Sequence, residues 1–279
     1  PLISVVIVSY NSREQIGACL QSLRRAHMPA PGGVLYEMRA DACEVIVVDN
    51  ASPDNTADWI AEHAPDVRLI RSPVNRGFAA GCNAGIRAAH PDAPHVLLLN
   101  PDTAVAPAAL ARTLRYLDEH PAVGVVGGRL LAPDGSAQPS ARRLPGPLRK
   151  LAMLSGLSAR FPFEPAFADV DHARQTAGIS GPVDWVVGAY FCMRRAMLNQ
   201  TGLLDEDYFL YFEEIDLCRA ARRHGYSVHY LHTAEITHIG GASAKTSAGT
   251  VSKAGSQLVG FRTESELIYY RKNDSLARA

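Results

Sequence analysis

The sequence predicts an α/β fold in which a mainly parallel central sheet is flanked by helices. Apolar runs of strand length alternate with segments in which apolar residues recur at helical spacing, and several of the runs end in Ser, Asn or Asp. Strands that alternate with helices form parallel sheets covered on both faces. With 279 residues and 47% hydrophobic content, the chain is long enough for one such domain with a large core.

The first strand is predicted at residues 3–8, a nearly unbroken apolar run that leads into Ser9, Tyr10 and Asn11. Ser12 followed by Gln15 has the spacing of a capping box, so a helix is expected directly after this turn.

The same arrangement follows twice more. Residues 45–48 form an apolar run that ends in Asp49 and Asn50, and Ser52-Pro53 has the residue types of a helix N-cap and first position. A third short strand at 67–70 precedes a polar turn at 75–78 and a helix of small residues at 79–89.

A fourth strand ends in Asn100-Pro101-Asp102. Ligands bind at the carboxyl ends of strands in such sheets, so Asp102 stands where a metal ion or a diphosphate would be held. The alternative is an ordinary turn, because Asn and Asp bond their own backbone and Pro presets φ. Together, the four polar strand ends would line one rim, which is where a nucleotide would bind.

Composition excludes several classes of protein. Lys plus Arg and Asp plus Glu both number 28, so a nucleic-acid role has no electrostatic support. No apolar stretch is long enough to span a membrane, and the apolar start lacks a basic leader, which favours a first strand over a signal peptide. The five cysteines are scattered without paired spacing, as expected for reduced thiols in the cytoplasm.

Regular periodicity is lost at residues 134–181, which are rich in Pro and Gly. Long irregular segments inside compact domains are usually lids, binding loops or disorder. A mixed basic and apolar stretch at 142–154 would suit anionic lipid headgroups or a phosphate. Its alternative is a solvated basic turn beside a packed amphipathic helix.

The second half carries two groups of candidate residues. A strand-like run at 183–193 contains Asp184, which suits an acceptor hydroxyl, and Trp185 and Tyr190, which are either core aromatics or platforms for a sugar ring.

The second group is Glu213, Glu214 and Asp216 at the start of a helix whose last turn is basic. One of them can be a general base if it faces a pocket. The alternative is that the acids only complement the helix dipole, with Asp216 paired to Arg219 or Arg223.

The order of several short segments resembles the family-2 glycosyltransferases, and within them the bacterial rhamnosyltransferase-like branch. The segments are Val-Ser-Tyr-Asn, Val-Asp-Asn-Ala-Ser, Asn-Arg-Gly-Phe-Ala-Ala-Gly-Cys-Asn, Leu-Asn-Pro-Asp, Val-Gly-Ala, Tyr-Phe-Glu-Glu-Ile-Asp-Leu-Cys and His-Ile-Gly-Gly. The resemblance runs from Ile3 to about Gly241. It implies a single GT-A domain over 1–279, with a nucleotide-binding half (1–131), the irregular segment (134–181), an acceptor and catalytic half (182–245) and a C-terminal loop and helix (246–279).

The implied reaction is metal-assisted transfer of a sugar from a nucleoside diphosphate, with inversion at the anomeric carbon. The resemblance implies that the nucleotide is contacted by Ser9, Tyr10, Asn11, Asp49, Asn75, Gly77, Phe78, Asn83, Asn100 and Asp102. Asp49 would bond the pyrimidine ring or the ribose. Asp102 matches the last acid of an Asp-x-Asp metal motif whose first acid is replaced by Asn100.

Glu214 matches the acid that acts as base in a Glu-Asp motif, here written Glu-Glu. His238 matches a late histidine that joins the metal or the diphosphate, although a lone His after a strand is often structural. Gly240 and Gly241 after it would let backbone approach a ligand closely. Asp102, His238 and two phosphates would suit Mg or Mn.

The expected donor is a dTDP- or UDP-sugar, with rhamnose from dTDP-rhamnose in first place. The expected acceptor is a cell-surface glycan or a polyprenyl-linked precursor, reached by peripheral contact at the inner face of the cell membrane. Two other classes stay open. A sugar nucleotidyltransferase has a similar rim carboxylate but normally begins with a Gly-rich loop that Ser9 to Ser12 lack, and a non-catalytic sugar-binding module would not need the acidic cluster.

Overall fold

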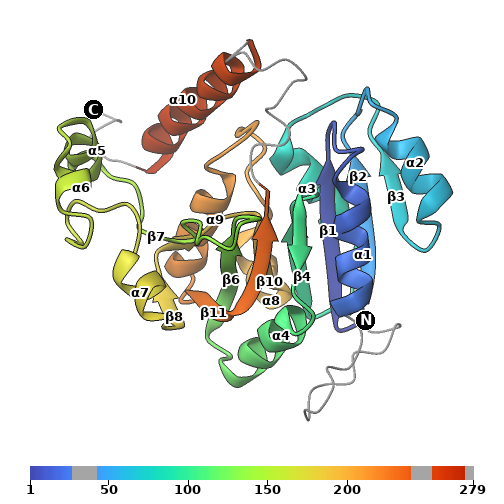
Figure 1. The fold of residues 1–279 in the computed structure, drawn as a ribbon, viewed down its shortest axis with the longest axis horizontal. Helices are drawn as coiled ribbons and strands as arrows, with labels where there is room; N and C mark the ends of the chain where they lie inside the picture. Colours follow the sequence, from blue (N-terminus) through green and yellow to red (C-terminus); the bar gives the residue numbers. More distant parts are fainter. Residues whose placement is uncertain (27–42, 240–252, 274–279) are drawn as a thin grey trace.

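In a computed structural model, which describes residues 1–26, 43–239 and 253–273, one large sheet runs through the molecule (Figure 1). Its first four strands are all parallel, in the order β3-β2-β1-β4. They are β1 (Ile3–Ser9), β2 (Cys43–Asp49), β3 (Arg68–Arg71) and β4 (His95–Leu99). The predicted α/β fold with a mainly parallel sheet is therefore confirmed.

The rest of the sheet is mixed. β10 (Tyr190–Arg194) runs antiparallel to both β4 and β6 (Val123–Leu131), whereas β11 (Ser227–His238) is parallel to β6. The short strands β5 (Thr103–Val105) and β8 (Gly181–Val183) both run antiparallel to β11. Because β10 is reversed, its first residues lie at the same rim as the last residues of its neighbours.

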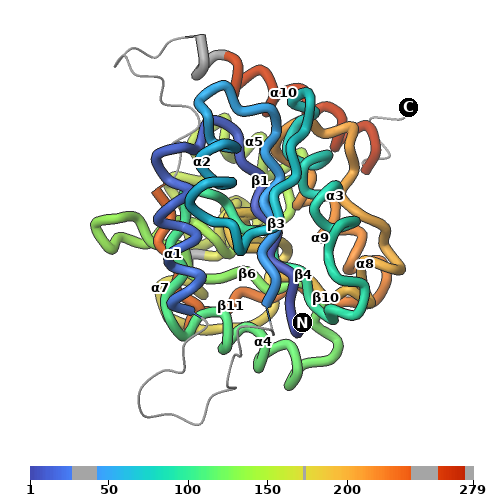
Figure 2. Tube along the Cα trace, turned by 90° about the vertical axis from the view of Figure 1, so that its right-hand side faces the viewer, coloured from blue at the N-terminus to red at the C-terminus, as the bar shows by residue number. Residues whose placement is uncertain are grey.

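Helices cover both faces of the sheet (Figure 2). One core packs α1 (Ile16–Ala26), α2 (Thr56–His63) and α4 (Ala109–Glu119) against one face. A second core packs α3 (Phe78–Ala88), α8 (Arg195–Thr201) and α9 (Glu213–Arg223) against the other. Successive strand residues point to opposite faces, so Val5 and Ile7 belong to the first core and Val6 and Val8 to the second. This explains why β1 is apolar at successive positions from Val5 to Val8.

Two helix starts differ from the sequence-based expectation. The Ser12 hydroxyl donates to the Tyr10 carbonyl oxygen at 3.2 Å instead of capping α1, which begins at Ile16. α2 begins at Thr56 and not at Pro53. The reason is that Ser52 Oγ accepts the backbone N–H of Asn11 at 3.1 Å, so Ser52 joins two rim turns rather than starting a helix.

The predicted strand at 183–193 is three separate strands, because β8 is followed by β9 (Trp185–Val186) and then by β10. β9 pairs with β7 (Ala141–Arg142) in a small second sheet. The segment 134–181 carries more regular structure than expected, with three short helices: α5 (Pro147–Leu154), α6 (Leu157–Arg160) and α7 (His172–Ala177).

The last helix, α10 (Lys253–Asn273), packs on the loop that leads into α9 (Figure 1). Tyr269 is buried with its ring centroid 5.4 Å from that of Phe212, and Ser265 Oγ donates to the Leu210 carbonyl at 2.9 Å. None of the helices within the described ranges is both long and apolar enough to cross a bilayer.

Candidate active site

The sheet register brings the polar strand ends together at one rim. Ser9 is the register neighbour of Asp49, and His238 at the end of β11 is the neighbour of Thr103. The backbone N–H of Asn100 donates to the Ala189 carbonyl at 3.1 Å, which joins the end of β4 to the start of β10. The rim predicted from the sequence is therefore continuous from β2 to β11.

Asp49 is a buried acid of the first half. Its side chain accepts hydrogen bonds from Ser9 Oγ at 3.1 Å and from the Ser52 N–H at 3.0 Å. Asn11 and Ala51 beside it have φ of 57° and 62°, a region that non-glycine residues seldom adopt and that is common at binding sites. Tyr10 is 41% exposed and offers an aromatic face at this point.

The turn at 75–78 packs on the loop that leads into α9. Asn75 Oδ1 accepts hydrogen bonds from the Gly77 N–H and from Asn50 Nδ2, both at 2.9 Å, which fixes the turn. The Phe78 N–H donates to the Phe209 carbonyl at 2.7 Å. Contact of Asn75, Gly77 or Phe78 with a nucleotide stays a prediction. The packing of this turn against Phe209 fixes the position of the loop at residues 208–212.

Asn83 corrects the expected nucleotide-binding set. Its side chain is 1% exposed, and its amide bonds both the N–H and the carbonyl of Leu204 and also Glu206 Oε1. These bonds occupy the amide inside the protein, so it is not available to a nucleotide. Glu206, which sequence reasoning missed, also pairs with Arg76 at 3.0 Å and Arg87 at 3.3 Å. No local motif marks it, because its partners lie more than 100 residues away.

Asp102 and His238 face each other at the end of β11. His238 Nε2 lies 3.5 Å from Asp102 Oδ1, and both side chains are largely buried. Burial lowers the pKa of His238, and the Asp102 charge partly opposes this shift. In the described part of the chain no three His, Cys, Asp or Glu side chains gather as a metal cluster, so these two would be joined by ligands from the donor. Gly240 and Gly241 lie outside the described residues.

Asn100 is half-buried beside this pair, and its carbonyl accepts the Thr103 hydroxyl at 2.7 Å. The Asp102 and His238 pair fits a hard divalent cation, because an oxygen and an imidazole nitrogen with a lone pair can approach one ion from two sides.

Glu213 and Glu214 begin α9 and are both buried, at 3% and 9% exposure. Tyr211 and Phe212 before them have φ of 71° and 73°, so the chain enters the helix through two strained residues. The Oε2 atom of each glutamate is buried and has no hydrogen-bond partner. Uncompensated polar atoms of this kind are rare in proteins and point to a function.

The two neighbouring carboxyl groups are buried together, and each affects the pKa of the other. Burial and the neighbouring charge of Glu214 raise the pKa of Glu213 well above its ordinary value. Burial also raises the pKa of Glu214, but backbone N–H groups, the bond from Glu213 and the charge of Arg142 oppose this shift. Both pKa values are raised, and the upward shift is the larger for Glu213, so Glu213 is the more readily protonated member of the pair.

Asp216 differs from both. It accepts a hydrogen bond from Asn273 Nδ2 at 2.7 Å, and Arg219 and Arg223 also bond Asn273. The predicted ion pair of Asp216 with Arg219 or Arg223 is therefore replaced by a shared contact with the end of α10.

Of the two aromatics expected to be either core residues or sugar platforms, the structure places Tyr190 in the core, whereas Trp185 is half-buried. Tyr190 is fully buried and its hydroxyl bonds the Thr113 hydroxyl at 2.8 Å, so it is a core residue. Trp185 Nε1 donates to the Arg143 carbonyl at 2.8 Å, and the Arg142 guanidinium lies 5.5 Å from its ring centre. Both aromatics therefore serve packing in this structure.

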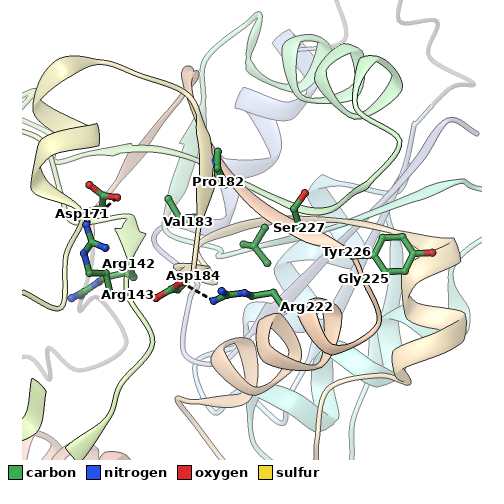
Figure 3. A pocket seen from close by; sticks show the side chains of 11 residues that line it. Arg142, Arg143, Asp171, Pro182, Val183, Asp184, Arg222, Gly225, Tyr226 and Ser227 are labelled. Atoms are coloured by element: carbon green, nitrogen blue, oxygen red, sulfur yellow. Dashed lines mark hydrogen bonds and ion pairs between the residues drawn. The ribbon is translucent and has the colours of Figure 1, made fainter. Parts of the chain in front are cut away.

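Asp184 is held by Arg222 at 2.6 Å and by the Leu144 N–H at 2.9 Å. It lines a pocket of about 380 Å³ shown in Figure 3. Arg222 lies nine residues after Glu213 in α9, or about 14 Å along the axis at 1.5 Å per residue. Arg142 also lines the pocket and acts on the charge of Glu214, so an acceptor contact by Asp184 stays a prediction.

Comparison with known proteins agrees with the fold. GalNAc-T7, solved with UDP, GalNAc and Mn²⁺, superposes with a TM-score of 0.62 at 14% identity over 99% of this chain and 52% of that one. TarS 1–349 of S. aureus, solved with UDP, gives a TM-score of 0.57 at 15% identity over 98% of this chain and 74% of that one. These two similarities show a shared GT-A architecture.

Sequence comparison is more specific. An N-acetylglucosaminyl-diphospho-decaprenol L-rhamnosyltransferase of Mycobacterium tuberculosis is 30% identical over 205 residues, which cover 70% of this chain and 66% of that protein. The low-salt glycan biosynthesis hexosyltransferase Agl10 of Haloferax volcanii is 26% identical over 238 residues, covering 85% of this chain and 66% of that protein. The chain thus matches just under two thirds of the length of these relatives.

The family model for glycosyl transferase family 2 matches residues 4–200, which include the rim from Ser9 to Asp102. Glu213 and His238 lie beyond that match, so their roles rest on the geometry described above. Because the model covers well over half of the chain, this protein belongs to glycosyl transferase family 2.

Proposed function

We propose that this chain is an inverting, metal-dependent glycosyltransferase that moves a sugar from a nucleoside diphosphate to an acceptor hydroxyl. The observation that carries the proposal is the buried Glu213 and Glu214 pair at the same rim as Asp102. A Cβ placed on Gly188 would lie 3.9 Å from Glu214 Oε1, and Ala189 next to it bonds Asn100. These contacts connect the carboxylate pair to the metal-binding strand end.

Inversion by direct displacement needs one base that takes the proton of the acceptor hydroxyl. Glu214 suits this role because it is the less readily protonated member of the pair, and burial raises its pKa and hence its basicity. Glu213 keeps its proton and donates to Glu214, so it orients the base. Asp102 and His238 would hold a divalent ion, which neutralises charge on the departing diphosphate.

The proposed binding site for the base of the nucleotide donor consists of Asp49 and Tyr10. The imide N–H of a uracil or thymine ring can donate to a fixed carboxylate, and an exposed aromatic ring can stack on the base. The rhamnosyltransferase named above makes dTDP-rhamnose the first donor to test, with UDP-sugars next. The same relative, which acts on a decaprenol-linked substrate by its name, makes a polyprenyl-linked glycan the first acceptor to test.

A contact with the membrane that carries such an acceptor is proposed for α5 and α6, which lie beside α10 in Figure 1. Seven apolar side chains at 148–163 are more than a third exposed: Leu148, Leu151, Met153, Leu154, Leu157, Phe161 and Phe163. The basic residues expected to bind lipid are already engaged within the protein. Arg142 pairs with Asp169 and Lys150 with Glu266. The proposed contact is therefore mainly apolar, with the enzyme at the inner face of the membrane.

The experiment that tests the function is a transfer assay with a panel of nucleotide sugars and a short-chain polyprenyl-diphosphate glycan, with Mn²⁺ or with a chelator. The expected result is metal-dependent release of dTDP or UDP with the inverted anomer in the product. Preferential turnover of GDP- or ADP-sugars would contradict the donor assignment. Formation of a nucleotide sugar from a nucleoside triphosphate would instead identify a nucleotidyltransferase, and sugar binding without turnover a binding module.

A further inference from the structure

Gln138 makes two hydrogen bonds to one residue, His238. Its Nε2 donates to the His238 carbonyl oxygen at 2.7 Å, and its Oε1 lies 2.8 Å from His238 Nδ1. Gln138 is itself fixed, because its N–H donates to the Leu130 carbonyl at 2.9 Å and its carbonyl accepts Gln175 Nε2 at 3.0 Å. The backbone of Gln138 is thus held by two hydrogen bonds, and its side chain extends from there to His238.

The two bonds determine which ring nitrogen carries the proton. A backbone carbonyl only accepts, so the NH₂ end of the Gln138 amide must face it. The oxygen end then faces Nδ1, which must donate. A neutral His238 consequently has its proton on Nδ1 and its lone pair on Nε2, the atom 3.5 Å from Asp102 Oδ1.

This tautomer leaves two electron-pair donors facing each other with no proton between them. A solvent-exposed histidine side chain prefers the opposite tautomer, with the proton on Nε2, which would give Asp102 a hydrogen bond and block the ring nitrogen. We propose that Gln138 is a positioning residue that holds His238 in the Nδ1–H form, so that Nε2 and Asp102 can ligate one divalent cation. The cation-binding part of this inference rests on the function proposed above, whereas the tautomer part does not.

The test has two readouts. In metal-free protein labelled with ¹⁵N-histidine, long-range proton–nitrogen correlation spectra above the pKa of His238 report which nitrogen is protonated; a His238→Gln variant assigns the signals. Wild type is expected to show an unprotonated Nε2, and Gln138→Leu a shift towards protonated Nε2. Mn²⁺ affinity in the presence of dTDP or UDP, measured by electron paramagnetic resonance, is expected to fall about tenfold in Gln138→Leu.

Gln175→Ala is the matched control. It removes one of the bonds that fix the Gln138 backbone but keeps both side-chain bonds to His238, so the Nδ1–H tautomer is expected to stay and any loss of Mn²⁺ affinity to be smaller than in Gln138→Leu. Gln138→Glu keeps an acceptor for Nδ1–H and is expected to retain the Nδ1–H tautomer. A proton on Nε2 in wild type, or an unchanged tautomer in Gln138→Leu, overturns the inference. If wild type binds no Mn²⁺ with nucleotide, the proposed metal site fails while the tautomer readout still decides the role of Gln138.

Discussion

A Cβ atom on Gly77 would lie 2.4 Å from the carbonyl oxygen of Phe209, closer than any side chain can be placed against backbone. The same turn donates the Phe78 N–H to that carbonyl. Phe209 belongs to the loop that enters α9 at Glu213, so the turn at 75–78 and the candidate base are one packed unit. A motif that resembles a nucleotide contact therefore also determines where the acid pair stands.

Gly77→Ala is expected to reduce transfer by more than its effect on stability explains. The residue has φ of 89° and ψ of 174°, a region that is essentially restricted to glycine and costs other residues about 1–3 kcal/mol, and the clash must in addition displace Phe209. Gly202→Ala is the control, because Gly202 has φ of 81° and ψ of −175° but nothing within 4 Å of a Cβ. Melting temperature and turnover are compared in both. Equal losses of turnover in the two variants would show that the contact with Phe209 is irrelevant to the site.

Nucleotide binding is expected to strengthen clearly with Mg²⁺ or Mn²⁺. Asp102 and His238 supply two ligands, so the ion is held well only when the diphosphate adds its oxygens. Calorimetric titration of dTDP and UDP with and without metal measures this, and Asp102→Asn should remove the metal effect but leave the weak metal-free binding. If wild type binds nucleotide with equal affinity in the presence and absence of metal, the proposed metal site is wrong.

The difference between what the sequence predicted and what it missed follows from distance along the chain. The alternation of strands and helices, and the carboxylates at strand ends, are local patterns, and β1, β2, β4 and α9 were found from them. The bonds that decide individual roles join distant segments: Asn83 to Leu204, and Gln138 to His238. No local pattern contains them.

Tyr190 is a second example of a role that a local sequence pattern cannot predict. An aromatic residue in an apolar run has the same local signature whether it faces a ligand or the core. Only the pairing register, in which Tyr190 lies opposite the core residue Leu99, places it on the face where its hydroxyl meets Thr113.

Glu213→Gln is expected to increase stability at neutral pH. In wild type the folded state holds a proton on Glu213 up to a pKa well above the unfolded value of about 4.3. Between these two values the folded state binds more protons than the unfolded state, so the free energy of unfolding falls as pH rises. Glutamine removes the part of this slope that Glu213 contributes, and the part from Glu214, whose pKa burial also raises, remains. Urea midpoints from pH 5 to 8 measure the slope, with exposed Glu119→Gln as control; a slope in Glu213→Gln as steep as in wild type would refute the raised pKa of Glu213.

Membrane binding is expected to survive high salt, because the basic residues of 142–150 are already paired and exposed leucines remain. Leu151→Glu, at a side chain that is 63% exposed, should abolish flotation with anionic liposomes, since a charge must then enter the interface. Ile179→Glu is the control, at an apolar residue that is 55% exposed outside α5 and α6. Flotation of wild type that disappears in high salt would point to an electrostatic contact instead.

The strongest single test concerns the base. Glu214→Gln keeps the size and burial of the side chain but cannot take a proton, and a general base typically contributes about 10² to 10⁴-fold in rate. Turnover should fall by that order while dTDP or UDP and metal still bind.

Glu213→Gln should cost less, because an amide can still donate to Glu214. Asp216→Asn should act mainly through melting temperature, since Asp216 contacts Asn273 and not the pair. Transfer in wild type should also be lost as pH falls through the raised pKa of Glu214, because protonation removes the base. Near-normal turnover in Glu214→Gln with a large loss in Glu213→Gln would exchange the two roles within the pair.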